Sequence, residues 1–388
     1  MSPDQTAIAS SQGASAGEGS SVGGRSRLFM KQKVMLRVVY ALVPILISAI
    51  YFFGWRVLAI LAVTWAAGLT TEFITSRQRG QPVSMANFVT CWLLALSMPP
   101  TVPFWIAAVA AIVAILFGKE VFGGFGRNFA NPAIVGRTFV YVCFPTALTA
   151  RFVPAFKGFP GGLAHWSFES ARELPQYLAA SGKQVADAIS QASPMWVNKH
   201  MAAEASAKAI SLWDMLFGSI GGVFQTESGT RILAAGSAGE GCALLIGLAG
   251  VYLIATRTAN WRLIVSALAG LGAATLLFRH VMGLTGPGGV PPIQFTLLAG
   301  TTLYVTVFMV TDPVSAPSRR PAQYAYGAMI GFLIVLLRWK GAFVAAASFS
   351  ILLGNLCSPL LDIGATTWSN WRKARTKARA ASAKEAAA

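Results

Sequence analysis

Residues 34–53 read VMLRVVYALVPILISAIYFF and residues 55–75 read WRVLAILAVTWAAGLTTEFIT, with a single glycine between them. Each stretch is as long as a helix that crosses a bilayer, which takes about 20 mostly apolar residues. A backbone inside lipid must satisfy its own polar groups, as a helix does. Eight more apolar stretches follow, so the sequence predicts an all-α integral membrane protein with about ten transmembrane helices. These eight lie at about 84–99, 102–118, 132–149, 238–256, 262–280, 292–310, 322–338 and 340–362.

The composition excludes a soluble protein. Of the 388 residues, 55% are hydrophobic and only 12% are charged, whereas soluble domains carry about 25% charged residues. The formal net charge of +17 would suggest a nucleic-acid partner if it lay on one soluble face. The basic residues instead fall between the apolar stretches and in the tails, and no base-stacking or groove-reading module accompanies them. The predicted partner is the lipid bilayer, and no nucleic acid is expected.

The distribution of Lys and Arg predicts the orientation. If the N-terminus is cytoplasmic, 19 of the 31 basic residues lie on the cytoplasmic side, in breaks and tails. Cytoplasmic segments carry an excess of such residues. We therefore expect a multi-pass protein of the bacterial cytoplasmic (inner) membrane with both termini in the cytoplasm. The short breaks on the opposite side hold only Arg56, Arg279, Arg338 and Lys340.

The apolar stretches divide the chain into five regions. The Ser-, Gly- and Ala-rich N-terminus predicts a disordered cytoplasmic tail. Five membrane segments precede the polar region 150–235, which therefore faces outward and is expected to hold amphipathic helices and loops. The five regions are residues 1–33 (tail), 34–149 (first five segments), 150–235 (extracytoplasmic loop region), 236–362 (second five segments) and 363–388 (basic cytoplasmic tail).

The four cysteines give no indication of a metal centre. All lie inside apolar segments and none forms a CxxC pair, so neither a zinc site nor an iron–sulfur cluster is expected within this chain. We interpret them as small core residues. They are Cys91, Cys143, Cys242 and Cys357.

A glycine- and amide-rich segment lies at the predicted membrane edge, with the sequence FGGFGRNFANP over residues 122–132. Glycines let a backbone approach a ligand closely, and N–H groups at a helix start attract anions. The same residues also suit a tight turn with helix caps, and the residues alone leave both interpretations open. The candidate binding residues are Gly123, Gly124, Asn128 and Asn131.

Two carboxylates near the predicted membrane ends are further candidates. Asp312 lies in TDPVSAP, residues 311–317, and Glu240 lies in GSAGEG, residues 236–241. A carboxylate at such a position is costly unless it is hydrated or paired. Each side chain could contribute to a ligand site or simply cap a helix.

Together with GNLCSPLLD at residues 354–362, these segments resemble a known family. It comprises the D-type subunit (RnfD) of the Rnf electron-transport complex and the B-type subunit (NqrB) of the sodium-translocating NADH:quinone oxidoreductase. The resemblance also covers residues 88–100, 236–240 and 256–262, and it extends from about residue 34 to 362.

The resemblance implies ten helices and an FMN joined by a phosphoester to a hydroxyl side chain in an outward-facing loop. The family pattern at this attachment is Asp-x-x-Ser-Gly-Ala-Thr. Here the matching stretch is DAISQAS, which keeps Asp187 and Ser190 but has Gln191 in place of Gly and Ser193 in place of Thr. A serine hydroxyl can form the same ester, so the resemblance implies covalent FMN on Ser193.

A second stretch, Gly364-Ala365-Thr366, is a more literal match to the end of the pattern. Its spacing from Asp362 is wrong, and it lies at the predicted cytoplasmic end of the last helix. Since the family attaches FMN on the outer face, Ser193 is preferred.

The resemblance further implies a flavin-carrying subunit that relays electrons from reduced ferredoxin or NADH to an acceptor, coupled to Na⁺ or H⁺ transport. A second, non-covalent flavin (riboflavin) in the bundle, the other subunits of the complex and a flavin transferase are the expected cofactor and partners. The RnfD type is preferred to the NqrB type.

Two alternatives stay open from the sequence. The apolar helices alone suit a solute transporter or channel without redox chemistry equally well. The altered attachment pattern favours, instead, a scaffold subunit that lost its covalent flavin. Flavin in the purified protein distinguishes both from the redox subunit.

Overall fold

The computed structural model describes residues 29–30, 32–149, 155–156, 159–167, 212–218, 223–226, 229–232, 236–285, 289–341 and 345–385. Most of the predicted N-terminal tail and most of the loop region 150–235 lie outside these residues. The predicted flavin-attachment residues Asp187, Ser190 and Ser193 also lie outside them.

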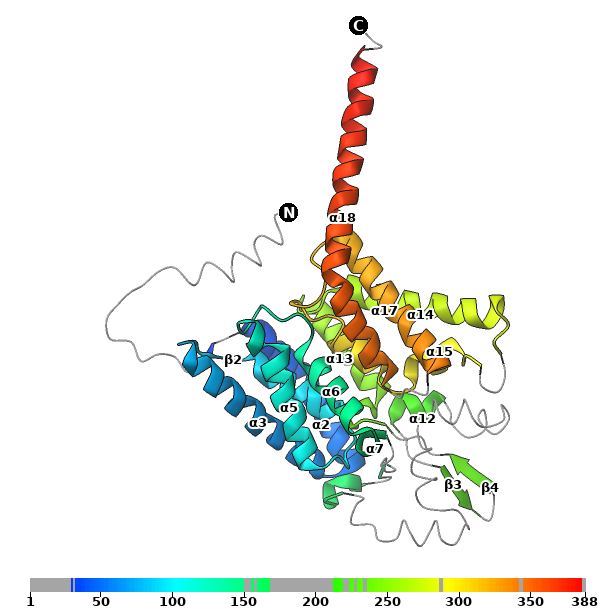
Figure 1. The fold of residues 1–388 in the computed structure, drawn as a ribbon. Coiled ribbons are helices and arrows are strands. Elements are labelled where there is room, and N and C mark those ends of the chain that lie inside the picture. The colour runs from blue at the N-terminus through cyan, green and yellow to red at the C-terminus, as the bar shows by residue number, and fades with distance from the viewer. Residues whose placement is uncertain are drawn as a thin grey trace.

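The described chain is mostly helical (Figure 1). The first half contains α2 (Lys33–Phe53), α3 (Arg56–Gln78), α4 (Ala86–Leu96), α5 (Phe104–Gly118), α6 (Pro132–Cys143) and α7 (Pro145–Thr149). The second half contains α13 (Ala243–Ala255), α14 (Trp261–Leu276), α15 (Ile293–Leu298), α16 (Thr302–Phe308), α17 (Arg320–Lys340) and α18 (Ala346–Glu385). One π-helical turn, η6 (Leu277–Val281), extends α14.

Every predicted apolar stretch contains helix, and the protein is a multi-pass membrane protein. Among the described residues, six helices are long and apolar enough to cross a membrane. The helices α4, α6 and α13 are shorter, at 11, 12 and 13 residues. The stretch 292–310 is divided into α15 and α16. The number of ten crossings therefore stays a prediction.

The break between α15 and α16 lies at residues 299–301, where Gly300 adopts a positive φ of 66°. Only glycine takes this conformation without steric cost. The broken helix leaves carbonyl oxygens without helical partners. Arg338 of α17 donates to two of them, Thr296 O and Ala299 O, both at 3.1 Å. A buried cation thus satisfies the negative end of α15.

The end of α4 is built in a similar way. Pro99 and Pro100 stop the helix after Ser97, because proline has no N–H to donate. Arg56, at the start of α3, donates to Pro100 O at 3.0 Å and to Val102 O at 2.9 Å. An arginine side chain therefore donates hydrogen bonds to free carbonyl oxygens at both breaks, after α4 and between α15 and α16.

The helices of the two halves pack in matching pairs. In the first half α3 packs on α5, α5 on α6, and α2 on α4; in the second half α14 packs on α17, α17 on α18, and α13 on α16. Contacts between α2 and α13, and between α6 and α18, join the halves. The two halves of the described bundle therefore share three helix pairings in the same order along the chain.

Two small sheets are present that the sequence did not predict. β1 (Phe29–Met30) pairs in parallel with β2 (Val83–Ser84). β3 (Val223–Thr226) and β4 (Gly229–Ile232) form an antiparallel hairpin within the loop region, where helices and loops were expected. This hairpin lies at the opposite end of the molecule from the C-terminus of α18 (Figure 1).

Candidate functional site

Three of the predicted site residues line one cavity, which we call the Asn128–Asp312 cavity. It lies between α2, α4, the loop before α6, the end of α13 and the segment after α16, and has a volume of about 70 Å³. Its walls are mainly apolar side chains. Its polar lining comes from Thr90, Asn128, Asn131, Thr258, Thr311 and Asp312.

The two asparagines of this cavity differ in their bonding. Asn131 is the N-cap of α6, where its Oδ1 accepts from Ala133 N at 3.0 Å and its Nδ2 donates to Met309 O at 3.4 Å. Asn128 Oδ1 is buried and has no hydrogen-bond partner among the described residues. A buried acceptor without a partner costs about 1–3 kcal/mol. Asn128 is therefore the lining residue that most needs a ligand or water.

Asp312 is bonded locally rather than to an arginine. Its Oδ1 accepts from Val314 N at 3.3 Å, and its Oδ2 accepts from the hydroxyl of Ser315 at 2.7 Å. This is the capping geometry expected of aspartate at a turn. Asp312 thus holds the segment after α16 in place while it lines the cavity.

The chemistry of this cavity suits the ring of a flavin, but its volume does not. A flavin ring has a flat apolar body and a polar edge, which match the aliphatic walls and the amide and hydroxyl groups. Ligand pockets typically measure about 300–1,000 Å³, whereas this cavity measures about 70 Å³. A flavin fits here only if the lining moves outward.

Gly123 and Gly124 form a tight turn rather than an open set of donors. Their φ angles are 108° and 95°, in the left-handed region that favours glycine. Gly123 N donates to Glu120 O and Gly124 N to Lys119 O. Because both N–H groups are bonded within the chain, the turn interpretation accounts for both glycines.

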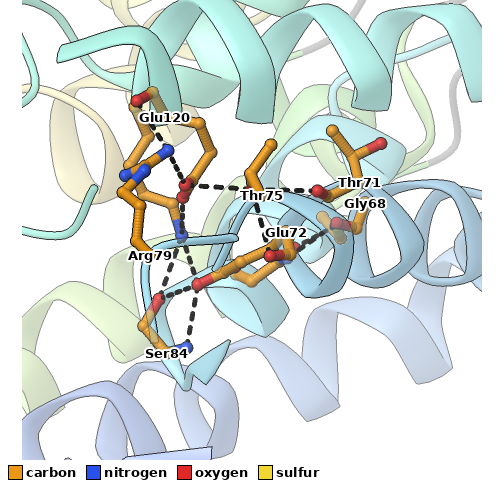
Figure 2. Close-up of polar contacts among 10 residues, drawn as sticks. Gly68, Thr71, Glu72, Thr75, Arg79, Ser84 and Glu120 are labelled. Atoms are coloured by element: carbon orange, nitrogen blue, oxygen red, sulfur yellow. Dashed lines mark hydrogen bonds and ion pairs between the residues drawn. The ribbon is translucent and has the colours of Figure 1, made fainter. Parts of the chain in front are cut away.

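Beside this turn lies a second polar site, the Glu72–Lys119 cluster, whose labelled members in Figure 2 include Glu72, Ser84 and Glu120. Glu72 and Lys119 are each 2% exposed. Lys119 Nζ lies 2.7 Å from Glu72 Oε1 and donates to the Ser84 hydroxyl at 3.0 Å. The backbone N–H of Ser84, in β2, also donates to Glu72 Oε1, at 2.8 Å. A buried charge pair of this kind is held by the hydrogen bonds around it.

A second ion pair adjoins the first. Arg79 Nη2 lies 2.7 Å from Glu120 Oε2 and also donates to the backbone oxygen of Glu120. Lys119 Nζ lies 3.4 Å from Glu120 Oε1, so the lysine is shared between two carboxylates. Two acidic and two basic groups therefore balance in charge. Figure 2 shows the contacts that Arg79 and Thr75 make with the Glu120 carboxylate.

One oxygen of this cluster is free. Glu72 Oε2 is buried and has no hydrogen-bond partner among the described residues. Glu72 also lines a cavity of about 270 Å³, whose walls include Glu120, Gly123, Gly124 and Arg127. A carboxylate oxygen beside a polar cavity is a place where a cation or a proton can bind.

The third polar site surrounds Glu240, which is 8% exposed. Its Oε1 lies 3.9 Å from Arg137 Nη2, and this nitrogen also lies 3.3 Å from the Ser237 hydroxyl. Arg137 belongs to α6, and Ser237 comes just before the 3-10 turn η5 (Ala238–Glu240). Glu240 is therefore a buried partner of arginine.

Sequence reasoning missed three buried cations. The topology count placed Lys119 in a cytoplasmic break and Arg338 in an outer break, and in the structure they are 2% and 8% exposed. Arg137 received no role and is 5% exposed. Each lies at a helix end or within a short helix, and only the packed bundle shows which carboxylates and carbonyls they contact.

The Thr366 alternative can be placed in the structure. Thr366 lies within α18, and its hydroxyl donates to Asp362 O at 2.8 Å, one helical turn earlier. The Asp362 carboxylate accepts from Ser318 N and Arg319 N, both at 2.9 Å, and so caps the start of α17. This stretch is regular helix, unlike an attachment loop.

Comparison with known proteins shows which family the chain matches. The model of the NQR2, RnfD, RnfE family matches residues 28–367. The chain is 33% identical over 340 residues to the D-type subunit of the ion-translocating oxidoreductase complex of Marinobacter nauticus, covering 85% of this chain and 88% of that protein. It is 30% identical over 352 residues to the protein of the same name from Stutzerimonas stutzeri, and this match covers 89% of this chain and 93% of that protein.

The chain is also similar to a relative of the second type. It is 32% identical over 307 residues to the B-type subunit of the Na(+)-translocating NADH-quinone reductase of Azotobacter vinelandii. This match covers 79% of this chain and 66% of that protein.

Proposed function

Because the chain belongs to the NQR2, RnfD, RnfE family, we propose that it is the flavin-carrying membrane subunit of an ion-translocating oxidoreductase complex. In this role it relays electrons across the membrane, coupled to Na⁺ or H⁺ transport, together with the other subunits. The observation that carries the proposal is the family match over residues 28–367, which includes almost the whole described bundle. The RnfD type is favoured, since the matches to D-type subunits cover more of both chains.

The proposed location is the bacterial cytoplasmic membrane with both termini in the cytoplasm. The excess of Lys and Arg in the tails and alternate breaks supports it. Lys119 was counted on the cytoplasmic side and Arg338 on the outer side, but both are buried. When both are left out of the count, the cytoplasmic side still has the excess of Lys and Arg. The positions of the β3–β4 hairpin and the C-terminus at opposite ends of the molecule agree with this orientation (Figure 1).

The proposed covalent cofactor is FMN on Ser193, attached by a flavin transferase. Ser193 matches the family's attachment position within DAISQAS, with Asp187 and Ser190 before it. When bound, a flavin supplies the electron-transfer chemistry that no amino-acid side chain of the bundle supplies. A covalent bond keeps such a cofactor from dissociating into an open aqueous compartment.

The proposed site of a second, non-covalent flavin such as riboflavin is the Asn128–Asp312 cavity. Asn128 and Thr90 would hold the polar edge of the ring, while Asn131 and Asp312 shape the walls. The present volume of about 70 Å³ is too small for a flavin ring, so the lining would have to move outward on binding. A flavin held between α2 and α4 would shorten the distance that electrons travel through a bilayer about 30 Å thick.

The Glu72–Lys119 cluster is the proposed site where the bundle handles the coupling ion. The free Oε2 of Glu72 adjoins the 270 Å³ cavity, and Lys119 can shift between Glu72 and Glu120, which lie 2.7 and 3.4 Å from it. A cation or proton arriving at Glu72 changes this balance of charge. Because the cluster is neutral before the ion arrives, a bound cation adds one positive charge, and Lys119 can relieve the repulsion by shifting from Glu72 toward Glu120.

Flavin content tests the proposal. The protein is co-expressed with its own flavin transferase and examined for flavin fluorescence in a denaturing gel. Fluorescence is expected in the wild type and in Thr366→Ala, and no fluorescence in Ser193→Ala. Protein without any flavin, in the wild type as in the variants, would contradict the proposal and favour a non-redox transporter or scaffold.

A further inference from the structure

The C-terminal part of α18 is a basic helix that continues beyond the region matched by the family. The family model ends at residue 367, whereas α18 runs without a break to Glu385. Figure 1 shows this part of the helix projecting away from the rest of the bundle. We call residues 368–382 the basic extension.

The basic extension makes no packing contact with the described part of the bundle over most of its length. The last buried residue of α18 is Ser358, and every residue from 371 to 382 is exposed. At 1.5 Å per residue, the twelve residues 371–382 extend about 18 Å past the bundle. These residues continue a helix of 40 residues, and no described part of the bundle covers them, so their side chains are available to a partner.

The charge of the basic extension is of one sign. It holds five basic residues and no acidic residue. Among the described residues, none of these five side chains forms an ion pair. Like charges three or four residues apart repel and destabilise a helix. The five are Arg372, Lys373, Arg375, Lys377 and Arg379.

The residues of the extension are sorted onto distinct faces of the helix. Arg372, Arg375 and Arg379, at spacings of three and four, share one face. Lys373 and Lys377 share another. Between these two faces lies a stripe of small residues that leaves room for the backbone of another protein. The stripe consists of Ala374, Ala378 and Ala381.

The direction of the helix favours a protein partner over the lipid surface. Trp368 and Trp371 stack with Arg372 and Arg375, at 5.0 and 5.2 Å, and Trp residues concentrate at the membrane interface. Arg379 is eight residues beyond Trp371, or about 12 Å along the axis, which exceeds the screening length of about 8 Å at physiological salt. From residue 365 to 385 the helix contains no Gly or Pro that would bend it toward the bilayer.

We propose that the basic extension is a docking helix for an acidic surface of another subunit of the complex, which contacts the alanine stripe and pairs with the arginine and lysine faces. This inference rests on the proposed function, since it requires a complex. The alanine stripe sets how closely the partner approaches, and the charges on both sides of it set the orientation.

Charge neutralisation in the full chain is the first test. A variant with Gln at all five basic positions keeps helix propensity and removes the charge. The matched control carries Gln at three uncharged positions of the same helix, namely Ser369, Thr376 and Ala380. Each affinity-tagged protein is expressed with the other subunits of its complex and purified over a range of KCl concentrations.

The expected result is that the neutralised variant retains roughly tenfold less of one subunit than the control does at low salt, because several charge pairs are lost. The wild type should lose the same subunit as KCl rises. If the neutralised variant retains every subunit at all salt concentrations, the docking inference is wrong and the proposed function stands. If even the wild type retains no subunit, both are wrong.

Photo-crosslinking identifies what the helix contacts. A photoreactive amino acid replaces Ala378, within the alanine stripe, or Thr376, on the opposite side of the helix. In the native membrane, position 378 should crosslink to one subunit of the complex and position 376 should crosslink far less. Crosslinks from position 378 to phospholipid alone would overturn the proposal and assign the basic extension to the membrane surface.

Discussion

The buried pair of Glu72 and Lys119 shows how single residues set the properties of this bundle. Their side chains are 3% exposed, and the lysine is shared with Glu120. Removing one partner of a buried pair leaves a charge without compensation and typically costs about 3–5 kcal/mol, whereas removing both is far less costly. Glu72 lies within the apolar stretch 55–75, and the sequence gives no means of finding its partner.

A double-mutant cycle tests this pair. Lys119→Met alone should lower the thermal unfolding temperature of the purified protein strongly. Adding Glu72→Gln to it should recover much of the loss, since no net charge then stays buried at this point. Additive losses in the double variant would show that the two side chains act independently. Ion-dependent turnover should weaken in the double variant, which lacks the Glu72 carboxylate but keeps no unbalanced charge at this point.

The two asparagines of the Asn128–Asp312 cavity are predicted to respond differently. Asn131→Ala removes the N-cap of α6 and should lower stability by about 0.5–2 kcal/mol. Asn128→Ala removes an acceptor that has no partner among the described residues, so stability should change little. Flavin that is extractable without breaking covalent bonds should decrease in Asn128→Ala. Unchanged extractable flavin in that variant would place the second flavin elsewhere.

At the scale of elements, the interrupted helices decide where polar groups lie. The long helices were predictable because about 20 consecutive apolar residues have few other structures available. The breaks were harder to predict. Pro99 and Pro100 indicated the end of α4, but the break at Gly300 depends on Arg338, a residue about 40 positions away that caps α15. The spacing of apolar residues along the chain gives no information about a contact between residues so far apart in the sequence.

Labelling of introduced cysteines tests the orientation of these elements. His200→Cys, in the predicted outer region, should react with an impermeant maleimide added to intact cells. Ala380→Cys, in the basic extension, should react only after the membrane is opened. The parent protein with its four native cysteines provides the background. Labelling of both positions from one side would mean that the number of crossings between them is even, contrary to the ten-segment topology.

At the scale of the whole molecule, the two halves explain how one chain brings distant segments together. The loop before α6 and the segment after α16 are about 180 residues apart, yet both line the Asn128–Asp312 cavity. The sequence singled out Asn128, Asn131 and Asp312 together with Gly123 and Gly124 as candidate binding residues, and only the first three line this cavity. It did not predict that Glu240 lies apart from them, with Arg137, because this depends on how η5 packs against α6.

The central claim is that this chain carries flavin, and mass spectrometry of one peptide tests it most directly. Complete tryptic cleavage after Lys183 and Lys199 releases residues 184–199, QVADAISQASPMWVNK, which contains both Ser190 and Ser193. The protein is co-expressed with its own flavin transferase. We predict that the peptide is then heavier than its unmodified form by the mass of FMN minus one water, and that fragment ions place this addition on Ser193. Finding only the unmodified peptide would contradict the account.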